Sequence, residues 1–270
     1  MRPIPVKNRI GKNNIDNAKG LKGNKLIRHY HNLLKEKSRL IASSAPIEKI
    51  KNVESELENI GIDAYQRASR SGQAEGKGGD SSKILIKWIR TTPCFSYCAR
   101  LKEPKDLLEI GSVSVDNKCS TCGLFRVSRI DLHSVHPLIK QQDFLERTPE
   151  EGLFTGISCS LVLNFAPPEL RAKMLLHCTG LLMPPNKEQP PWLFLVLPSP
   201  CITNSRYMDE KTLHSIMIQF GFICRQKSIS KKIAYYLYSY ECFPMKEIDW
   251  KKKIVNDGAT RNNFFIPCIL

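Results

Sequence analysis

The chain has 270 residues, 41% of them apolar, and its 41 Lys and Arg against 26 Asp and Glu give a formal net charge of +15. A disordered chain would have fewer apolar side chains, and a membrane span would need an uninterrupted apolar run of about 18 residues or more. The longest run is WLFLVL at 192–197, so we expect a soluble globular protein. The opening MRPIPVKNRI has no apolar stretch typical of a secretory signal, so we expect no export.

The positive charge is concentrated at the start of the chain. Residues 1–40 contain eleven Lys and Arg and two acids, a net charge of +9, whereas the other 230 residues contribute +6. Clustered positive charge favours a polyanionic partner, because each neutralised phosphate releases bound counterions. We therefore interpret residues 1–23 as a basic flexible arm that contacts nucleic acid. A solubilising tail, a nuclear-import signal and contact with an acidic membrane surface remain alternatives.

Residues 24–103 form a predicted N-terminal helical region with a Gly-rich loop. Apolar residues at helical spacing predict one helix over 26–41 and a second over 47–60. The stretch 65–83 is too polar and Gly-rich for regular structure until 80–82, which can cap a short helix with an apolar face.

Beyond Pro104 short apolar runs alternate with helical patterns, which indicates a parallel sheet. One helix is expected after Pro167 and another after Asp209. The strand-like runs before the last helix are 107–110, 125–131, 138–145, 157–165 and 192–197.

The chain then continues with two runs, 222–229 and 232–240, that only two residues separate. Strands joined so tightly must be antiparallel, since a parallel crossover needs about a dozen residues. Parallel strands followed by an antiparallel hairpin predict an α/β fold with a Rossmann-like class I methyltransferase sheet. We expect this domain to cover 104–245 and a C-terminal tail to cover 246–270.

In a doubly wound sheet the ligand lies outside the carboxyl ends of the strands. The first strand ends with Glu109 and Gly111, where glycine lets the backbone approach a ligand and an acid suits the amine of S-adenosylmethionine. The second strand ends in Asp131, 20 residues after Gly111, a spacing typical of an acid that accepts hydrogen bonds from ribose hydroxyls. The third places Asp143 near an adenine amino group. Together these residues predict a nucleoside site.

Each of these residues also has a simpler interpretation. Gly111 can be a turn glycine, and Asp131 can be a cap or a surface acid. The G-x-G-x-x-G pattern of nicotinamide-cofactor enzymes and the GxxxxGK[ST] pattern of NTPases are both absent from the sequence.

Ten cysteines are present, and four of them have the spacing of a split zinc site. These are the pairs Cys94–Cys98 and Cys119–Cys122. Cys94 lies between Pro93 and Phe95 as in a packed segment, and no His is near either pair. We therefore favour reduced core thiols and no metal site.

Several sequence strings resemble those of one family. In chain order they are YQRAS-x2-GQ, GGDSSK, LEIGSVS, RIDL, IKQQDFLER, SLVLNFAP and PSPCITNSRYMDEKTL. Over roughly residues 24–245 the chain is similar to the fungal 25S ribosomal RNA adenine-N1 methyltransferase family, whose metazoan relatives include an S-adenosylmethionine sensor of TOR signalling.

The resemblance implies a cofactor, S-adenosyl-L-methionine, and a reaction, methylation of N1 of an adenine in large-subunit ribosomal RNA. It implies that Gly111 and Asp131 contact the cofactor, and that Asp143 and residues 160–165 lie at the adenine-side and substrate-side strand ends. The expected partner is this rRNA or a pre-ribosomal particle in the nucleolus of the nucleus, with no membrane or DNA partner. A non-catalytic sensor of the same cofactor is the alternative function, and a methyltransferase that acts on a protein or a small molecule is a third possibility.

Adenine N1 has a free lone pair at neutral pH, so methyl transfer to it needs alignment more than a strong general base. The target base must be single-stranded or flipped, because N1 lies in the Watson–Crick edge. Asn164 is our candidate catalytic residue, an acceptor for the adenine amino group. The alternative is that Asn164 caps the helix that begins near Pro167.

Overall fold

The computed structural model describes residues 21–72, 79–134, 136–247 and 249–268. The chain divides into two compact units, residues 1–77 and 78–270. Residues 79–103, predicted as part of the N-terminal helical region, thus belong to the same unit as the sheet. Residues 1–20 of the predicted arm and 73–78 of the predicted Gly-rich loop lie outside the described residues.

The described part of the first unit consists of three helices: α1 (Asn24–Ala42), α2 (Ile47–Ile60) and α3 (Ile62–Gly72). α1 and α2 confirm the two helices predicted from apolar spacing. Leu26, Tyr30 and Leu33 bury one face of α1, and Val53 is buried on α2. Two residues predicted on the apolar faces are not part of this core. Ile41 near the end of α1 is exposed, and Ile47 at the start of α2 is 71% exposed.

α3 corrects the prediction that the chain from 65 onward is irregular, because residues 65–72 are helical. The Tyr65 ring stacks on Tyr30 with ring centroids 4.6 Å apart, and Ala68 is buried. Tyr65 Oη also shares a hydrogen bond of 2.9 Å with His31 Nε2. Contacts with α1 therefore stabilise a segment whose polar composition alone predicts a loop.

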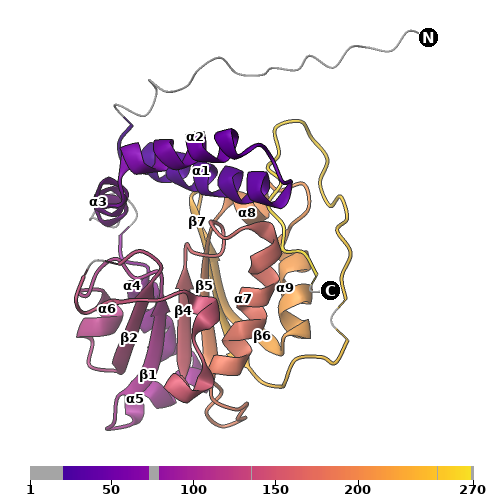
Figure 1. The fold of residues 1–270 in the computed structure, drawn as a ribbon. Helices are drawn as coiled ribbons and strands as arrows, with labels where there is room; N and C mark the ends of the chain where they lie inside the picture. Colours follow the sequence, from indigo (N-terminus) through magenta and orange to yellow (C-terminus); the bar gives the residue numbers. More distant parts are fainter. Residues whose placement is uncertain (1–20, 73–78, 135, 248, 269–270) are drawn as a thin grey trace. The chain divides into compact units, whose positions relative to one another are not determined.

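The second unit is built on a seven-stranded sheet with the order β3-β2-β1-β4-β5-β7-β6 (Figure 1). The first five strands are parallel, and β7 pairs antiparallel with β5 and with β6. This arrangement confirms the predicted Rossmann-like α/β fold of the class I methyltransferase type. The strands are β1 Lys105–Ile110, β2 Phe125–Asp131, β3 Lys140–Gln141, β4 Gly156–Ser160, β5 Trp192–Pro198, β6 Phe222–Ile229 and β7 Ile233–Tyr240.

Two strands are shorter than predicted. β3 has only two residues, because Asp143 accepts a hydrogen bond from Leu145 N–H and starts the 3₁₀ turn η2 (Phe144–Glu146). β4 ends at Ser160, and the next residue, Leu161, has a φ of 58° that breaks the extended backbone. The segments after both strands are therefore turns at the carboxyl edge of the sheet.

Alternating side chains of the central strands face two separate hydrophobic clusters. On β5, Leu193 and Leu195 belong to the cluster covered by α7 (Pro168–Leu181) and α9 (Glu210–Gln219). Phe194 and Val196 belong to the cluster covered by α4 (Ser82–Thr91), α5 (Tyr97–Arg100) and α6 (Lys118–Thr121). The remaining helical segments of this unit are η1 (Pro93–Phe95), η3 (Pro149–Glu151) and α8 (Pro200–Thr203).

The segment predicted as a C-terminal tail is packed against the sheet domain. Phe264 and Ile266 are buried in the cluster beneath α7 and α9. The Arg171 guanidinium of α7 donates to Phe265 O and lies 4.4 Å from the centre of the Phe264 ring. Trp250 Nε1 donates to Ile266 O. These contacts make much of the described part of 246–268 a component of the fold.

No helix in the described part of the chain is long and apolar enough to cross a membrane.

Candidate active site at the carboxyl edge of the sheet

The strand order reverses between β1 and β4, and ligand-binding residues are expected at the carboxyl ends of these strands. From β1 the chain proceeds outward to β2 and β3, and then returns to the other side of β1 with β4 and β5. The register places Ile110 beside Ile130 on one side and Cys159 on the other. In open α/β sheets ligands bind at this switch point. The residues at the carboxyl ends of β1, β2 and β4 are therefore the candidates for ligand binding.

Gly111 follows β1 in a conformation that only glycine adopts easily. Its φ is 70°, and a Cβ at this position would lie 2.4 Å from Val162 Cγ2 in the segment after β4. Its N–H donates to Ile130 O, which connects the turn to β2. These contacts support the interpretation of Gly111 as a turn glycine. Contact with a cofactor stays a prediction beside that role.

The segment after β4 turns sharply at a residue with an unfavourable backbone conformation. Leu161 has positive φ, which is rare for a residue with a bulky side chain. Its N–H donates to Val196 O of β5, and both Phe165 and Ala166 N–H donate to Val162 O. Strained residues of this kind cluster at functional sites, where the surrounding structure holds them.

Asn164 lies within this turn and is partly buried. The N-cap residue of α7 is Pro167, three residues after Asn164, so Asn164 is not itself the N-cap of that helix. The turn places Asn164 at the carboxyl edge, as the predicted catalytic role requires. That role itself stays a prediction.

Glu109 is buried at the end of β1 and both its oxygens are hydrogen-bonded. Oε2 accepts from Ser112 Oγ at 3.0 Å, and Oε1 accepts from Asn117 Nδ2 at 2.6 Å. Burial raises the pKa of the Glu109 carboxyl, and these hydrogen bonds act against that shift. Glu109 thus shapes the loop between β1 and α6, and its predicted contact with the methionine amine must coexist with this structural role.

The two aspartates, at the end of β2 and just after the neighbouring β3, keep acceptor capacity. Asp131, the last residue of β2, accepts from His133 N–H through Oδ1 at 2.9 Å, and burial raises the pKa of its carboxyl. Asp143 follows β3, which pairs with β2 through Asp131 and Gln141. A carboxylate has about four lone-pair sites, so one backbone hydrogen bond leaves acceptors for hydroxyl or amino groups. The oxygens of Asp131 and Asp143 therefore suit a nucleoside.

The structure adds Asp80, Ser81 and Ser82 to this edge, where their position in the sequence predicted a helix cap. Asp80 Oδ1 accepts from Ser82 N–H and Oγ, and Oδ2 accepts from Lys118 N–H. Ser82 Oγ in turn accepts from Cys119 N–H at 3.0 Å. This network connects the start of α4 to the start of α6.

Ser81 extends the same network to the fourth strand. Its Oγ shares a hydrogen bond of 2.8 Å with the Oγ of Ser160, the last residue of β4. The string GGDSSK marks these residues in the sequence. Their partners are 37 to 79 residues away, so the string alone does not reveal what it holds.

The cysteines do not form a metal cluster among the described residues. None of the ten forms a disulfide with another described residue, and in the described ranges no three His, Cys, Asp or Glu side chains are placed to hold a metal ion. Cys98 and Cys119 are buried, and burial raises the pKa of Cys119 to about 12. A thiol with this pKa stays protonated at neutral pH.

The sequence matches a known family over most of its length. A family model described as Bmt2, 25S rRNA (adenine(2142)-N(1))-methyltransferase, matches residues 51–266. The chain belongs to this family. The match includes all the strands of the sheet and the packed segment around Phe265. It confirms the resemblance stated from the sequence strings.

A curated relative from Saccharomyces cerevisiae (strain ATCC 204508 / S288c) is named 25S rRNA (adenine(2142)-N(1))-methyltransferase. It is 40% identical to this Bmt2-family chain over 211 residues, which are 76% of the chain. The chain spans 59% of that relative's length.

Two of the solved structures to which the chain is similar are methyltransferases. One is the Burkholderia thailandensis 1,6-didemethyltoxoflavin-N1-methyltransferase with bound 1,6-didemethyltoxoflavin and S-adenosylhomocysteine, at 12% identity and a TM-score of 0.44, covering 65% of this chain and 87% of that one. The other is magnesium protoporphyrin IX methyltransferase (ChlM) from Synechocystis PCC 6803 with bound SAM. It has 16% identity and a TM-score of 0.43, and the match covers 68% of this chain and 94% of that one.

Proposed function

We propose that the chain is an S-adenosyl-L-methionine-dependent methyltransferase that methylates N1 of an adenine in large-subunit (25S) ribosomal RNA. The family match over residues 51–266 carries this proposal, because it includes every strand of the sheet and every turn of the candidate site. The yeast relative, named for the same reaction, supports it at 40% identity.

S-adenosyl-L-methionine supplies an electrophilic methyl group on a sulfonium centre. In our assignment Asp131 accepts hydrogen bonds from the ribose hydroxyls and Asp143 accepts one from the adenine amino group of the cofactor. Gly111 lets the backbone after β1 approach the ligand, and Glu109 holds that loop through Ser112 and Asn117. The oxygens at this edge fit the donors that a nucleoside presents.

The target adenine needs positioning more than proton transfer. Its N1 lone pair would bond to the sulfonium methyl carbon as the carbon–sulfur bond breaks and the neutral thioether leaves, so the protein would contribute alignment of the two reactants and exclusion of water. In this proposal Asn164 accepts a hydrogen bond from the exocyclic amino group of the target, which orients N1. The base enters from a single-stranded or flipped nucleotide.

The partner in this proposal is large-subunit rRNA, either free or within a pre-ribosomal particle. The chain then acts in the nucleus, in the nucleolus, where such particles assemble, and no membrane or DNA partner is expected. The net charge of +9 in residues 1–40 supports an RNA partner, since charge of this sign attracts phosphate.

Methyl transfer from labelled cofactor to large-subunit rRNA that lacks the modification tests this function. We expect label in the RNA, and mapping of N1-methyladenine should locate it at one adenine. Cofactor binding without transfer to free rRNA or to pre-ribosomal particles would contradict the proposal and favour the non-catalytic S-adenosylmethionine sensor.

A further inference from the structure

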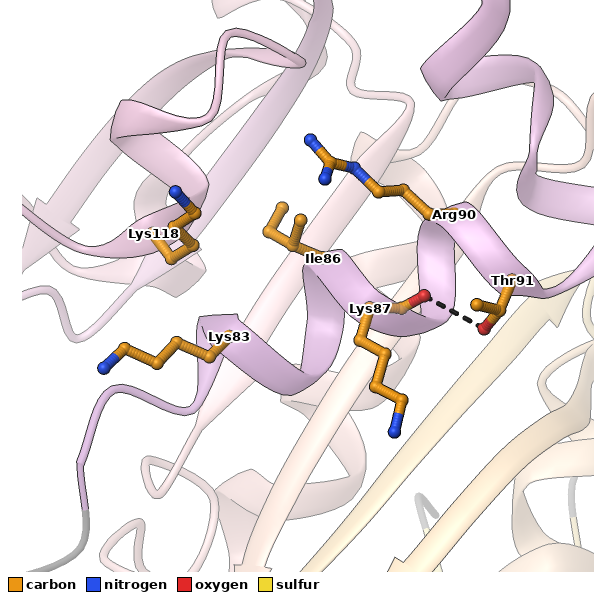
Figure 2. A pocket seen from close by; sticks show the side chains of 6 residues that line it. All are labelled: Lys83, Ile86, Lys87, Arg90, Thr91 and Lys118. Carbon is orange, nitrogen blue, oxygen red and sulfur yellow. Dashed lines mark hydrogen bonds between the residues drawn. The ribbon is translucent and has the colours of Figure 1, made fainter.

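A basic hollow lies on the outer side of α4. It has a volume of about 500 Å³, and Figure 2 shows its side chains around the helix. The lining includes four cationic side chains and no acidic one. The lining residues are Lys83, Ile86, Lys87, Arg90, Thr91 and Lys118.

Three of these cations come from one face of α4. Residues 83, 87 and 90 follow helical spacing and are exposed, whereas Leu85, Trp88 and Ile89 on the opposite face are buried against the sheet. With a rise of 1.5 Å per residue, positions 83 and 90 lie about 10 Å apart along the helix axis. Each strand of a duplex carries one phosphate per about 3.4 Å of helix axis, so this distance corresponds to about three nucleotide steps.

The fourth cation, Lys118, is the first residue of α6, the short helix between β1 and β2. Lys118 N–H donates to Asp80 Oδ2, which fixes Lys118 beside the start of α4. In Figure 2 the Lys118 side chain lies across from Arg90, with Ile86 between them. Ser81, next to Asp80, bonds to Ser160 at the end of β4. The start of α4, close to the lining residues Lys83 and Lys118, is therefore joined to the carboxyl edge that carries the candidate active site.

We propose that this hollow binds the phosphate backbone of an RNA strand, so that the strand crosses α4 on its way to the carboxyl edge. The inference deepens the proposed function and rests on it for the identity of the RNA. Four cations without an acid in the lining attract a polyanion. The apolar lining residue Ile86 is only 4% exposed, so the hollow offers no hydrophobic side chain that could anchor in a bilayer.

The double variant K87Q/R90Q tests the surface. Both side chains are exposed and neither belongs to the residues assigned to cofactor or target base. The matched control is K173Q/K211Q, which removes two exposed lysines from α7 and α9 over the other face of the sheet. Affinity for a fluorescein-labelled single-stranded RNA is measured by anisotropy at several salt concentrations. Cofactor binding by calorimetry provides the check that each variant is folded.

We expect K87Q/R90Q to weaken RNA binding about tenfold. The plot of log binding constant against log salt concentration should become less steep by about 1.4, because each of the two lost phosphate contacts contributes about 0.7. K173Q/K211Q should change neither, and both variants should bind cofactor as wild type does. The inference would be overturned if K87Q/R90Q and K173Q/K211Q had the same RNA affinity and the same salt dependence, or if the wild-type chain did not bind RNA.

Two further arms separate this inference from the proposed function and from a membrane partner. If wild type methylates rRNA and K87Q/R90Q does so with unchanged kcat/KM and affinity, the surface is wrong and the function stands. If K87Q/R90Q loses affinity for RNA that wild type never methylates, the surface stands and the function fails. Variant-sensitive binding to vesicles of phosphatidylcholine and phosphatidylserine, without RNA binding, would overturn the RNA assignment.

Discussion

Strand β5 and the carboxyl edge beside it are stabilised in different ways. The residues 192–197 of β5 are fully buried apolar side chains, paired on both sides with β4 and β7. The edge instead contains buried polar groups such as Glu109 and Ser112, and the positive φ angles of Gly111 and Leu161. Burial of apolar area maintains the strand, whereas hydrogen bonds between distant segments maintain the edge.

This difference has a functional meaning. A strand that is buried on both faces has no exposed surface for a ligand. An edge with polar groups and strained turns can present hydrogen-bonding atoms to a ligand. The network of Asp80, Ser81 and Ser82 connects three segments of this edge. Variants in the two regions should therefore separate folding from binding.

The largest effect on stability is expected in the strand. Phe194→Ala removes a fully buried ring that packs on Trp88 in the cluster beneath α4. We expect the free energy of unfolding to fall by about 3–5 kcal/mol, as is usual for Phe→Ala in a core. Urea denaturation measures this loss. Ile218→Ala on the exposed face of α9 is the control and should change stability little.

Gly111→Ala should have the next largest effect. The Cβ meets Val162 Cγ2 at 2.4 Å, and the positive φ adds backbone strain. We expect the free energy of unfolding to fall by about 2–4 kcal/mol from the steric contact and the backbone strain together. Gly123→Ala is the matched control, since its φ is 75° and a Cβ there meets nothing within 4 Å.

The difference between these two glycine variants measures the close approach to Val162. Adding Val162→Ala to Gly111→Ala should recover that difference in urea denaturation. If Gly111→Ala is no more destabilising than Gly123→Ala, the contact between the turns after β1 and β4 is not as tight as the structure indicates.

A smaller loss is expected for Asp80→Ala. The change removes the acceptor for Ser82 and for Lys118 N–H, and we expect about 1–3 kcal/mol, the usual effect of unsatisfied donors. Hydrogen exchange should show faster opening of the loop between β1 and β2. Asp116→Ala, an exposed acid of the same loop, is the control and should show neither change.

Asp131→Asn should have the smallest effect on the fold and a clear effect on binding. Burial raises the pKa of the Asp131 carboxyl, so its ionised form opposes folding above that pKa, and Asn should not lower stability at neutral pH. We expect cofactor affinity, measured by calorimetry, to fall about tenfold or more, because charge-assisted hydrogen bonds to the ribose are lost.

The pH dependence of binding tests the same residue. As pH falls through the raised pKa of Asp131, the carboxylate becomes protonated and cofactor affinity should decrease, starting at a higher pH than for an ordinary aspartate. The Asp131→Asn variant should lack this step. An identical pH profile in both proteins would contradict the assignment of Asp131.

Local sequence patterns predicted most of the helices and strands correctly, because apolar spacing reports burial directly. The tight link between 222–229 and 232–240 was enough to establish the antiparallel hairpin. The patterns failed where tertiary contacts decide. Residues 65–72 form a helix because Tyr65 packs on Tyr30, and β3 and β4 end early at Asp143 and Leu161.

The candidate site divides in the same way. Sequence spacing located Glu109, Gly111, Asp131 and Asp143 at successive strand ends, because parallel strands bring their carboxyl ends to one edge. It did not reveal that Glu109 uses both oxygens within its own loop, or that Gly111 must make room for Val162. Such facts depend on which distant segments come into contact.

By itself, then, the sequence determined the order of helices and strands, the family and the acids at the strand ends. Periodicity and short motifs are local properties of the chain. Only the tertiary structure decided that GGDSSK connects α4, α6 and β4, that Phe264 and Phe265 pack on Arg171, and that Lys118 joins the cations of α4. Each of these depends on hydrogen bonds or packing between residues dozens of positions apart, for which one sequence carries no local signal.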